Sequence, residues 1–119
     1  GITDPPNQSL RYQSDLINNP VRVLSVDDKL SRYVYGRKLR FKPGTGYGYS
    51  NTNYWLLGKI AERVTGKKIH QLMQAHIFDP AGMKHSYLEE RDDTNVARGY
   101  ADLYGQDRLL DVTIWDRAE

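Results

Sequence analysis

Residues 41–51 read Phe-Lys-Pro-Gly-Thr-Gly-Tyr-Gly-Tyr-Ser-Asn, with one proline and three glycines. Proline removes a backbone donor and glycine opens backbone angles that other residues avoid, so this run is neither a helix nor a regular strand. An apolar helical pattern follows at residues 52–65. A chain built in this way presents Tyr49, Ser50 and Asn51 at a fixed point, and the remaining segments are predicted to hold that loop in position.

Helices are predicted on both sides of this loop. A short one covers residues 9–18, and a second begins at Ser25, where Asp28 three residues later completes a capping box. Gly36 closes the second helix. Its apolar face repeats at helical spacing and consists of Val26, Leu30, Tyr33 and Val34.

The pattern at residues 52–65 predicts the longest helix, with Gly66 as a left-handed C-cap. Its apolar stripe is broad, which suggests burial on more than one side. The stripe contains Tyr54, Leu57, Ala61 and Val64, widened by Leu56 and Ile60. A further helix is predicted at residues 69–77, and Asp79-Pro80 stops it.

Neither end of the chain has the helical pattern of its middle. Residues 1–8 are expected to be turn, because Asp4-Pro5-Pro6-Asn7 places two prolines where each disfavours helix in the residue before it. Two short strands are predicted at residues 85–88 and 109–114, with turns at 92–95 and 104–107. The expected fold is therefore one mainly α domain over residues 1–119, with three to five helices and at most a small β-hairpin.

Composition excludes several functional classes. Seventeen basic and fifteen acidic residues leave a net charge of +2, too balanced to indicate nucleic acid or an anionic membrane. The absence of cysteine removes disulfides and thiolate chemistry, and no apolar run reaches the ~18 residues of a membrane span. The mean hydropathy of −0.72, with Gly1 rather than methionine at the start, suggests a processed product or a piece of a larger protein.

Tyr49 and Asn51 are the candidate functional residues. A tyrosine has a pKa near ~10 and acts as a base only where cations favour its phenolate, and most tyrosines simply pack a ring. Two residues on in an extended loop, Asn51 is expected on the same side as Tyr49. Its amide can donate to a substrate carbonyl or orient a neighbouring lysine. The bland alternative is that Asn51 caps a helix that begins at Thr52, and the two roles are compatible because they use the side chain and the backbone differently. No metal site is expected, since His70, His76 and His85 lack ligand spacing.

An ordered set of short motifs resembles the penicillin-recognising serine hydrolases. The branch concerned contains class C β-lactamases, D-alanyl-D-alanine carboxypeptidases, esterases and D-peptidases. Gly1-Ile2-Thr3-Asp4 also resembles the run that follows the family's Leu-Leu-x-His-Thr-Ser-Gly segment. The motifs are Pro43-Gly44-Thr45, Tyr49-Ser50-Asn51, Leu57-Gly58, Val64-Thr65-Gly66-Lys67, Pro80-Ala81-Gly82-Met83 and Gly99-Tyr100.

The resemblance implies a two-part fold, an α/β part and a mostly helical part, with the active site between them. It implies that Tyr49 is the proton shuttle of the Tyr-x-Asn motif and that Asn51 contacts the substrate amide or a lysine. The family's nucleophile is the serine of Ser-x-x-Lys, and a Lys-Thr-Gly or His-x-Gly strand lines the opposite wall. It also implies acylation and deacylation of an amide or ester without a cofactor, in an extracytoplasmic bacterial protein.

This sequence departs from the family pattern in two ways. No serine is followed three residues later by lysine, and neither Lys-Thr-Gly nor His-x-Gly occurs. The chain is therefore expected to be the helical part of such a hydrolase, inactive alone, with the missing α/β part as its partner and a small molecule or peptide as substrate. The alternatives are a non-catalytic binding or regulatory module of the same ancestry and an unrelated helical interaction domain. The family interpretation predicts an uncovered apolar surface beside the Tyr49 loop.

Overall fold

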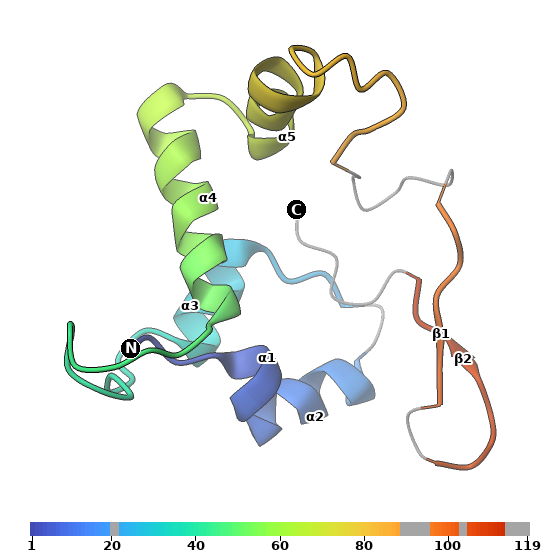
Figure 1. Cartoon of the computed structure of the whole chain (residues 1–119). Helices are drawn as coiled ribbons and strands as arrows, with labels where there is room; N and C mark the ends of the chain where they lie inside the picture. The colour runs from blue at the N-terminus through green and yellow to red at the C-terminus, as the bar shows by residue number, and fades with distance from the viewer. Residues whose placement is uncertain (20–21, 89–95, 103–104, 114–119) are drawn as a thin grey trace.

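The computed structural model describes residues 1–19, 22–88, 96–102 and 105–113. It is mainly helical with one two-stranded hairpin, as the sequence predicts (Figure 1). The elements in chain order are α1 (Pro5–Gln8), α2 (Leu10–Asn18), α3 (Val26–Tyr33), α4 (Asn51–Thr65), α5 (Ile69–Met73), the π-helix η1 (Gln74–Phe78), β1 (Tyr100–Ala101) and β2 (Leu110–Asp111).

The prediction that residues 1–8 are turn is wrong at residues 5–8. Pro5 and Pro6 open α1, a single helical turn, and the Asp4 carbonyl accepts from the backbone N–H of Gln8 at 2.9 Å. The first residues of a helix have no use for an intrahelical N–H, so proline costs little there. Its preset φ favours the turn. Asp4 before Pro5 stays outside the helix, with φ −119° and ψ 82°, as the steric restriction before a proline requires, and only Pro5 before Pro6 is helical against it.

The core lies where α2 and α3 meet. Tyr12 and Tyr33 are both 4% exposed, and their rings meet edge to face with centroids 5.0 Å apart. Leu30 beside them is 1% exposed, and Val34 completes the buried part of the face predicted for this helix. The Tyr33 hydroxyl donates to Asp15 Oδ2 at 2.6 Å. Burial, together with this carboxylate, raises the pKa of Tyr33 above its usual value.

The capping box predicted at Ser25 is present and starts α3. The Ser25 hydroxyl oxygen accepts from the Asp28 N–H, and the Asp28 carboxylate accepts from the Ser25 N–H. The same hydroxyl donates to Asp28 Oδ2 at 2.7 Å, which holds the pKa of that carboxyl below its usual range. Two backbone donors that would lack partners at the helix start are thereby satisfied.

Helix α4 rises from the α1–α3 cluster to α5 (Figure 1). It runs from Asn51 to Thr65. Gly66 follows as the left-handed C-cap that the sequence predicts, with a φ of 69°. The inner side of α4 meets the core through Trp55, whose ring centroid lies 6.4 Å from that of Tyr12. On the same side Lys59 Nζ pairs with Asp27 Oδ2 at 2.7 Å.

The helix predicted at residues 69–77 is present but changes type along its length. α5 ends at Met73, and the next five residues, η1, have the wider π geometry. The N–H of Asp79 accordingly reaches the carbonyl of Gln74, five residues back, at 2.9 Å. A turn through Gly82, at φ 66°, then ends the segment close to the predicted stop.

The hairpin forms, but its first strand is not the one predicted. β1 pairs antiparallel with β2, with Tyr100 opposite Asp111 and Ala101 opposite Leu110. Residues 85–88 are not strand. In the described part of the connection, the Asp102 carboxylate accepts from the N–H groups of Gln106 and Asp107, at 3.2 and 2.9 Å. The predicted turn at 92–95, and positions 104 and 114 of the other predicted elements, lie outside the described residues.

The molecule exposes more surface than a compact chain of its size. Its accessible surface is 8782 Å², whereas a folded monomer of 13.7 kDa is expected to expose about 6,600 Å². The radius of gyration is 16.6 Å, against about 13.5 Å for a compact domain of 119 residues. None of the helices in the described ranges has the length and apolar character needed to cross a membrane.

Candidate functional site

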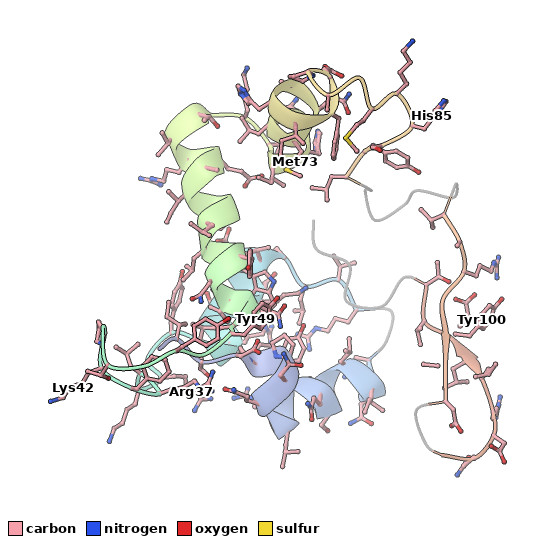
Figure 2. The ribbon with its side chains drawn as sticks, in the orientation of Figure 1. Arg37, Lys42, Tyr49, Met73, His85 and Tyr100 are labelled. Atoms are coloured by element: carbon pink, nitrogen blue, oxygen red, sulfur yellow. The ribbon has the colours of Figure 1, made fainter. Side chains whose placement is uncertain are left out.

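Tyr49 and Asn51 are brought together at the foot of α4. The Tyr49 hydroxyl donates to Asn51 Oδ1 at 3.2 Å. Ser50 between them points the other way, is 1% exposed, and donates through Oγ to the Thr3 carbonyl at 2.9 Å. This alternation follows from the extended backbone of Ser50, with φ −152° and ψ 124°. Figure 2 shows Tyr49 beside the lower end of α4.

The loop before Tyr49 is shaped by its glycines and held by the chain's first residues. Gly44 has a φ of 77°, and a Cβ on Gly48 would lie only 3.2 Å from the Phe41 ring. The backbone nitrogen of Gly1 donates to the Phe41 carbonyl at 2.6 Å, and the Arg40 N–H donates to the Gly1 carbonyl at 2.8 Å. The start of the loop is therefore tied to the first residue of the chain, while residues 42–47 are exposed.

Asp4 is the residue that sequence reasoning missed. It is 2% exposed, and its Oδ1 accepts from both the backbone N–H and the side-chain Nδ2 of Asn51, each at 3.1 Å. Oδ2 accepts from Asn7 Nδ2 at 2.7 Å. The two bonds from Asn51 to Asp4 join residues 47 positions apart, so no local spacing could reveal them. The only signal in the sequence was an acid inside the motif-like run at residues 1–4.

The alternative in which Asn51 caps α4 is wrong. The helix begins at Asn51 itself, Ser50 occupies the N-cap position, and the Ser50 side chain makes no capping bond. The Asp4 carboxylate supplies the missing acceptor instead, because it receives the Asn51 N–H at the positive end of the helix dipole. The Asn51 side chain is thus available to Asp4 and Tyr49.

Tyr49 is half exposed, at 52%. Its ring lies 5.8 Å, centroid to centroid, from the ring of Tyr54 one turn into α4. Arg40 Nη1 donates to the Tyr49 backbone carbonyl at 3.3 Å rather than to its phenol oxygen. The hydroxyl is a donor in this arrangement, and proton transfer would need a nucleophile and a cation brought to it from outside the described residues.

One side of α4 is apolar and uncovered. Tyr54, Leu57, Ile60 and Val64 are 61%, 59%, 58% and 79% exposed. The prediction that this broad stripe is buried on more than one side is therefore wrong for this chain, in which only the Thr52 and Trp55 side packs inward. The uncovered apolar surface beside the Tyr49 loop, expected from the family interpretation, is present.

The three histidines, all among the described residues, do not form a cluster that could bind a metal ion. His70 is half buried, while His76 and His85 are exposed on later segments. Across the residues whose positions are described, no three His, Cys, Asp or Glu side chains are grouped so that they could hold a metal ion.

Comparison with known proteins identifies relatives. The family model described as Beta-lactamase matches residues 4–118. A D-aminopeptidase of Gluconobacter oxydans is 37% identical over 70 residues, covering 58% of this chain and 13% of the relative. A lovastatin esterase of Penicillium rubens is 39% identical over 67 residues, covering 55% and 16%. An unguisins hydrolase of Aspergillus violaceofuscus is 39% identical over 75 residues, covering 56% and 13%. The chain spans less than a fifth of each of these relatives, and no solved structure matches it significantly.

Proposed function

Because this chain belongs to the β-lactamase family, we propose that it supplies the Tyr-x-Asn wall of a serine hydrolase active site. Tyr49 is the proton shuttle, and Asn51 holds a substrate amide or the lysine of the nucleophile motif. The substrate is an amide or ester, such as a D-amino-acid peptide, a β-lactam or a small ester. The relatives named as D-aminopeptidase and esterase support this class. The parent enzyme is proposed to work outside the bacterial cytoplasm.

The observation that carries the proposal is the uncovered apolar side of α4 next to Tyr49. Its four large side chains, Tyr54, Leu57, Ile60 and Val64, are each more than half exposed, and burying such side chains stabilises an interface by ~1.5–3 kcal/mol each before association costs. The same helix begins at the Tyr49–Asn51 pair. An element docked on this side would therefore stand next to the phenol oxygen, where the nucleophile and its lysine are required.

Gly58 gives a second reason to expect a close-packed partner on α4. It lies in the middle of the helix, where glycine costs ~1 kcal/mol relative to alanine. A Cβ at this position would meet no atom within 4 Å among the described neighbours, so packing within this chain does not require glycine. A glycine that packing within this chain does not require fits a position where another segment comes close to the helix backbone.

The partner is proposed to be the α/β part of the same hydrolase, which carries Ser-x-x-Lys and the opposite wall. We call residues 1–119 joined to that part the assembled enzyme. A non-catalytic module of the same ancestry would keep the docking side but lack Ser-x-x-Lys in the joined part. A free-standing interaction domain would leave α4 uncovered in every form of the protein.

Gly58→Leu separates these possibilities with two opposite effects. Leucine favours helix more than glycine, so the unfolding free energy of the 119-residue chain is expected to rise by up to ~1 kcal/mol. In the assembled enzyme the same side chain would stand beside Tyr54, at the edge of the uncovered apolar side of α4, and kcat/KM is expected to fall at least tenfold. Chemical denaturation of the chain and steady-state kinetics of the assembled enzyme measure the two effects.

The matched control is Ser14→Leu, an exposed position inside α2. It adds the same side chain away from α4 and is expected to leave kcat/KM within twofold. Full activity of Gly58→Leu would show that nothing docks closely on α4 and would remove the main support for the proposal.

A further inference from the structure

The Asp4 carboxylate determines which way the Asn51 amide points. An ionised carboxylate accepts hydrogen bonds and cannot donate them. Since Asp4 Oδ1 lies 3.1 Å from the Asn51 side chain, the Nδ2 group must face it. Oδ1 of Asn51 is then left facing the Tyr49 hydroxyl at 3.2 Å. Rotating the amide by half a turn would set two acceptors, Asn51 Oδ1 and Asp4 Oδ1, against each other, and would turn Asn51 Nδ2 toward the Tyr49 oxygen as a donor.

The surroundings of Asp4 hold the carboxylate in place. The side chain is 2% exposed, its other oxygen accepts from Asn7 Nδ2 at 2.7 Å, and its backbone carbonyl starts α1. The Asn51 backbone N–H adds a further bond at 3.1 Å. An acceptor fixed from α1 and α4 together cannot follow a rotation of the Asn51 amide, so the amide follows the acceptor.

We propose that Asp4 is a positioning residue of the active site, which orients Asn51 so that its amide oxygen, not its nitrogen, faces Tyr49. The inference rests on the proposed function, since it gives Asn51 a fixed polarity in the assembled site. Asp4 itself touches neither substrate nor nucleophile. Its loss frees the Asn51 amide to rotate and removes the defined partner of the Tyr49 hydroxyl.

The Asp4 carboxylate also accepts a hydrogen bond from the first backbone N–H of α4. The test must therefore separate this capping of the helix from the orientation of the Asn51 side chain. A double-mutant cycle in the assembled enzyme makes this separation. With Asn51 present, Asp4→Ala is expected to lower kcat/KM by roughly tenfold to a hundredfold, as small misplacements in active sites do. In the Asn51→Ala background no amide remains to orient, and Asp4→Ala is expected to cost less than twofold. Equal losses in both backgrounds would assign Asp4 to capping alone.

Two further variants keep the test independent of folding problems. Asp4→Ser retains an oxygen that caps helices but is too short to reach both nitrogens of Asn51, so it is expected to lose activity like Asp4→Ala. Asp4→Asn keeps an acceptor of the same reach, because the Asn51 N–H draws its oxygen inward, and the Asn7 amide can turn its own oxygen toward the new NH2 group. It is expected to recover most of the activity, and an Asp4→Asn enzyme as impaired as Asp4→Ala would contradict the proposal.

A spectroscopic readout distinguishes failure of this inference from failure of the proposed function. In nitrogen-15 NMR spectra of the assembled protein, the Asn51 side-chain amide protons are expected to exchange more slowly than those of exposed Asn53. That difference is expected to vanish in Asp4→Ser. An inactive wild-type protein with this signature would overturn the hydrolase proposal alone. An active enzyme in which substitution of Asp4 does not change the exchange of the Asn51 side-chain amide protons would overturn the positioning role alone.

Discussion

Tyr49→Phe in the assembled enzyme is expected to lower kcat by about 10²–10⁴-fold, the usual contribution of a positioned acid–base group. The substitution keeps the ring that packs 5.8 Å from Tyr54 and removes only the hydroxyl that bonds Asn51. Because a 52% exposed side chain contributes little to folding, stability is expected to change by less than ~0.5 kcal/mol. KM is expected to change much less than kcat, since the proton transfer belongs to the chemical step.

Tyr47→Phe is the matched control for this prediction. Tyr47 lies two residues earlier in the same loop and is 93% exposed. Removing its hydroxyl tests whether any tyrosine of the loop would show the effect, and kcat is expected to stay within twofold of wild type. A Tyr49→Phe enzyme that retains wild-type kcat in steady-state assays would exclude Tyr49 as the proton shuttle.

Leu30→Ala is expected to lower the free energy of unfolding by about 2–5 kcal/mol. Leu30 is 1% exposed and lies three residues before Tyr33 on α3, whose ring packs against the ring of Tyr12. The described core is small, so little surrounding structure can collapse into the cavity. Against a typical total of about 5–15 kcal/mol for a domain, this loss is a large fraction of the free energy of unfolding.

Leu10→Ala provides the comparison. It makes the same chemical change on α2 at a side chain that is 84% exposed, so the expected effect on stability is below ~0.5 kcal/mol. Urea denaturation followed by far-ultraviolet circular dichroism measures both variants. Similar midpoints for the two would show that α2 and α3 do not pack around Leu30.

Local chemistry explains which parts of the fold the sequence predicts. The Ser25–Asp28 capping box and the Gly66 C-cap act over a few residues, so both are readable from spacing. The turn of α1 is not predicted from the sequence pattern, because proline breaks the interior of a helix but is tolerated at its first positions. The first hairpin strand was misplaced because a two-residue strand such as β1 carries almost no periodic signal.

In the candidate site, too, local features are predictable from the sequence and long-range contacts are not. Alternation in an extended loop predicts that Tyr49 and Asn51 share a side, and their hydrogen bond shows it. Asp4 reaches Asn51 only because residues 1–4 fold back onto the loop, a long-range contact that no spacing rule contains. The stripe on α4 was readable as apolar, but whether it is covered depends on what packs there and not on its own residues.

The most direct test of the central claim compares the 119-residue chain with the assembled enzyme. Both are incubated with a nitrocefin-type β-lactam, a p-nitrophenyl ester and a D-alanyl p-nitroanilide, and turnover is followed by absorbance. The chain alone is expected to stay at the buffer rate. The assembled enzyme is expected to hydrolyse at least one substrate and to form an acyl adduct, visible by mass spectrometry, on the Ser-x-x-Lys serine. Turnover by the chain alone, or an assembled protein that neither turns over nor acylates, would contradict the claim that these residues supply one wall of a serine hydrolase.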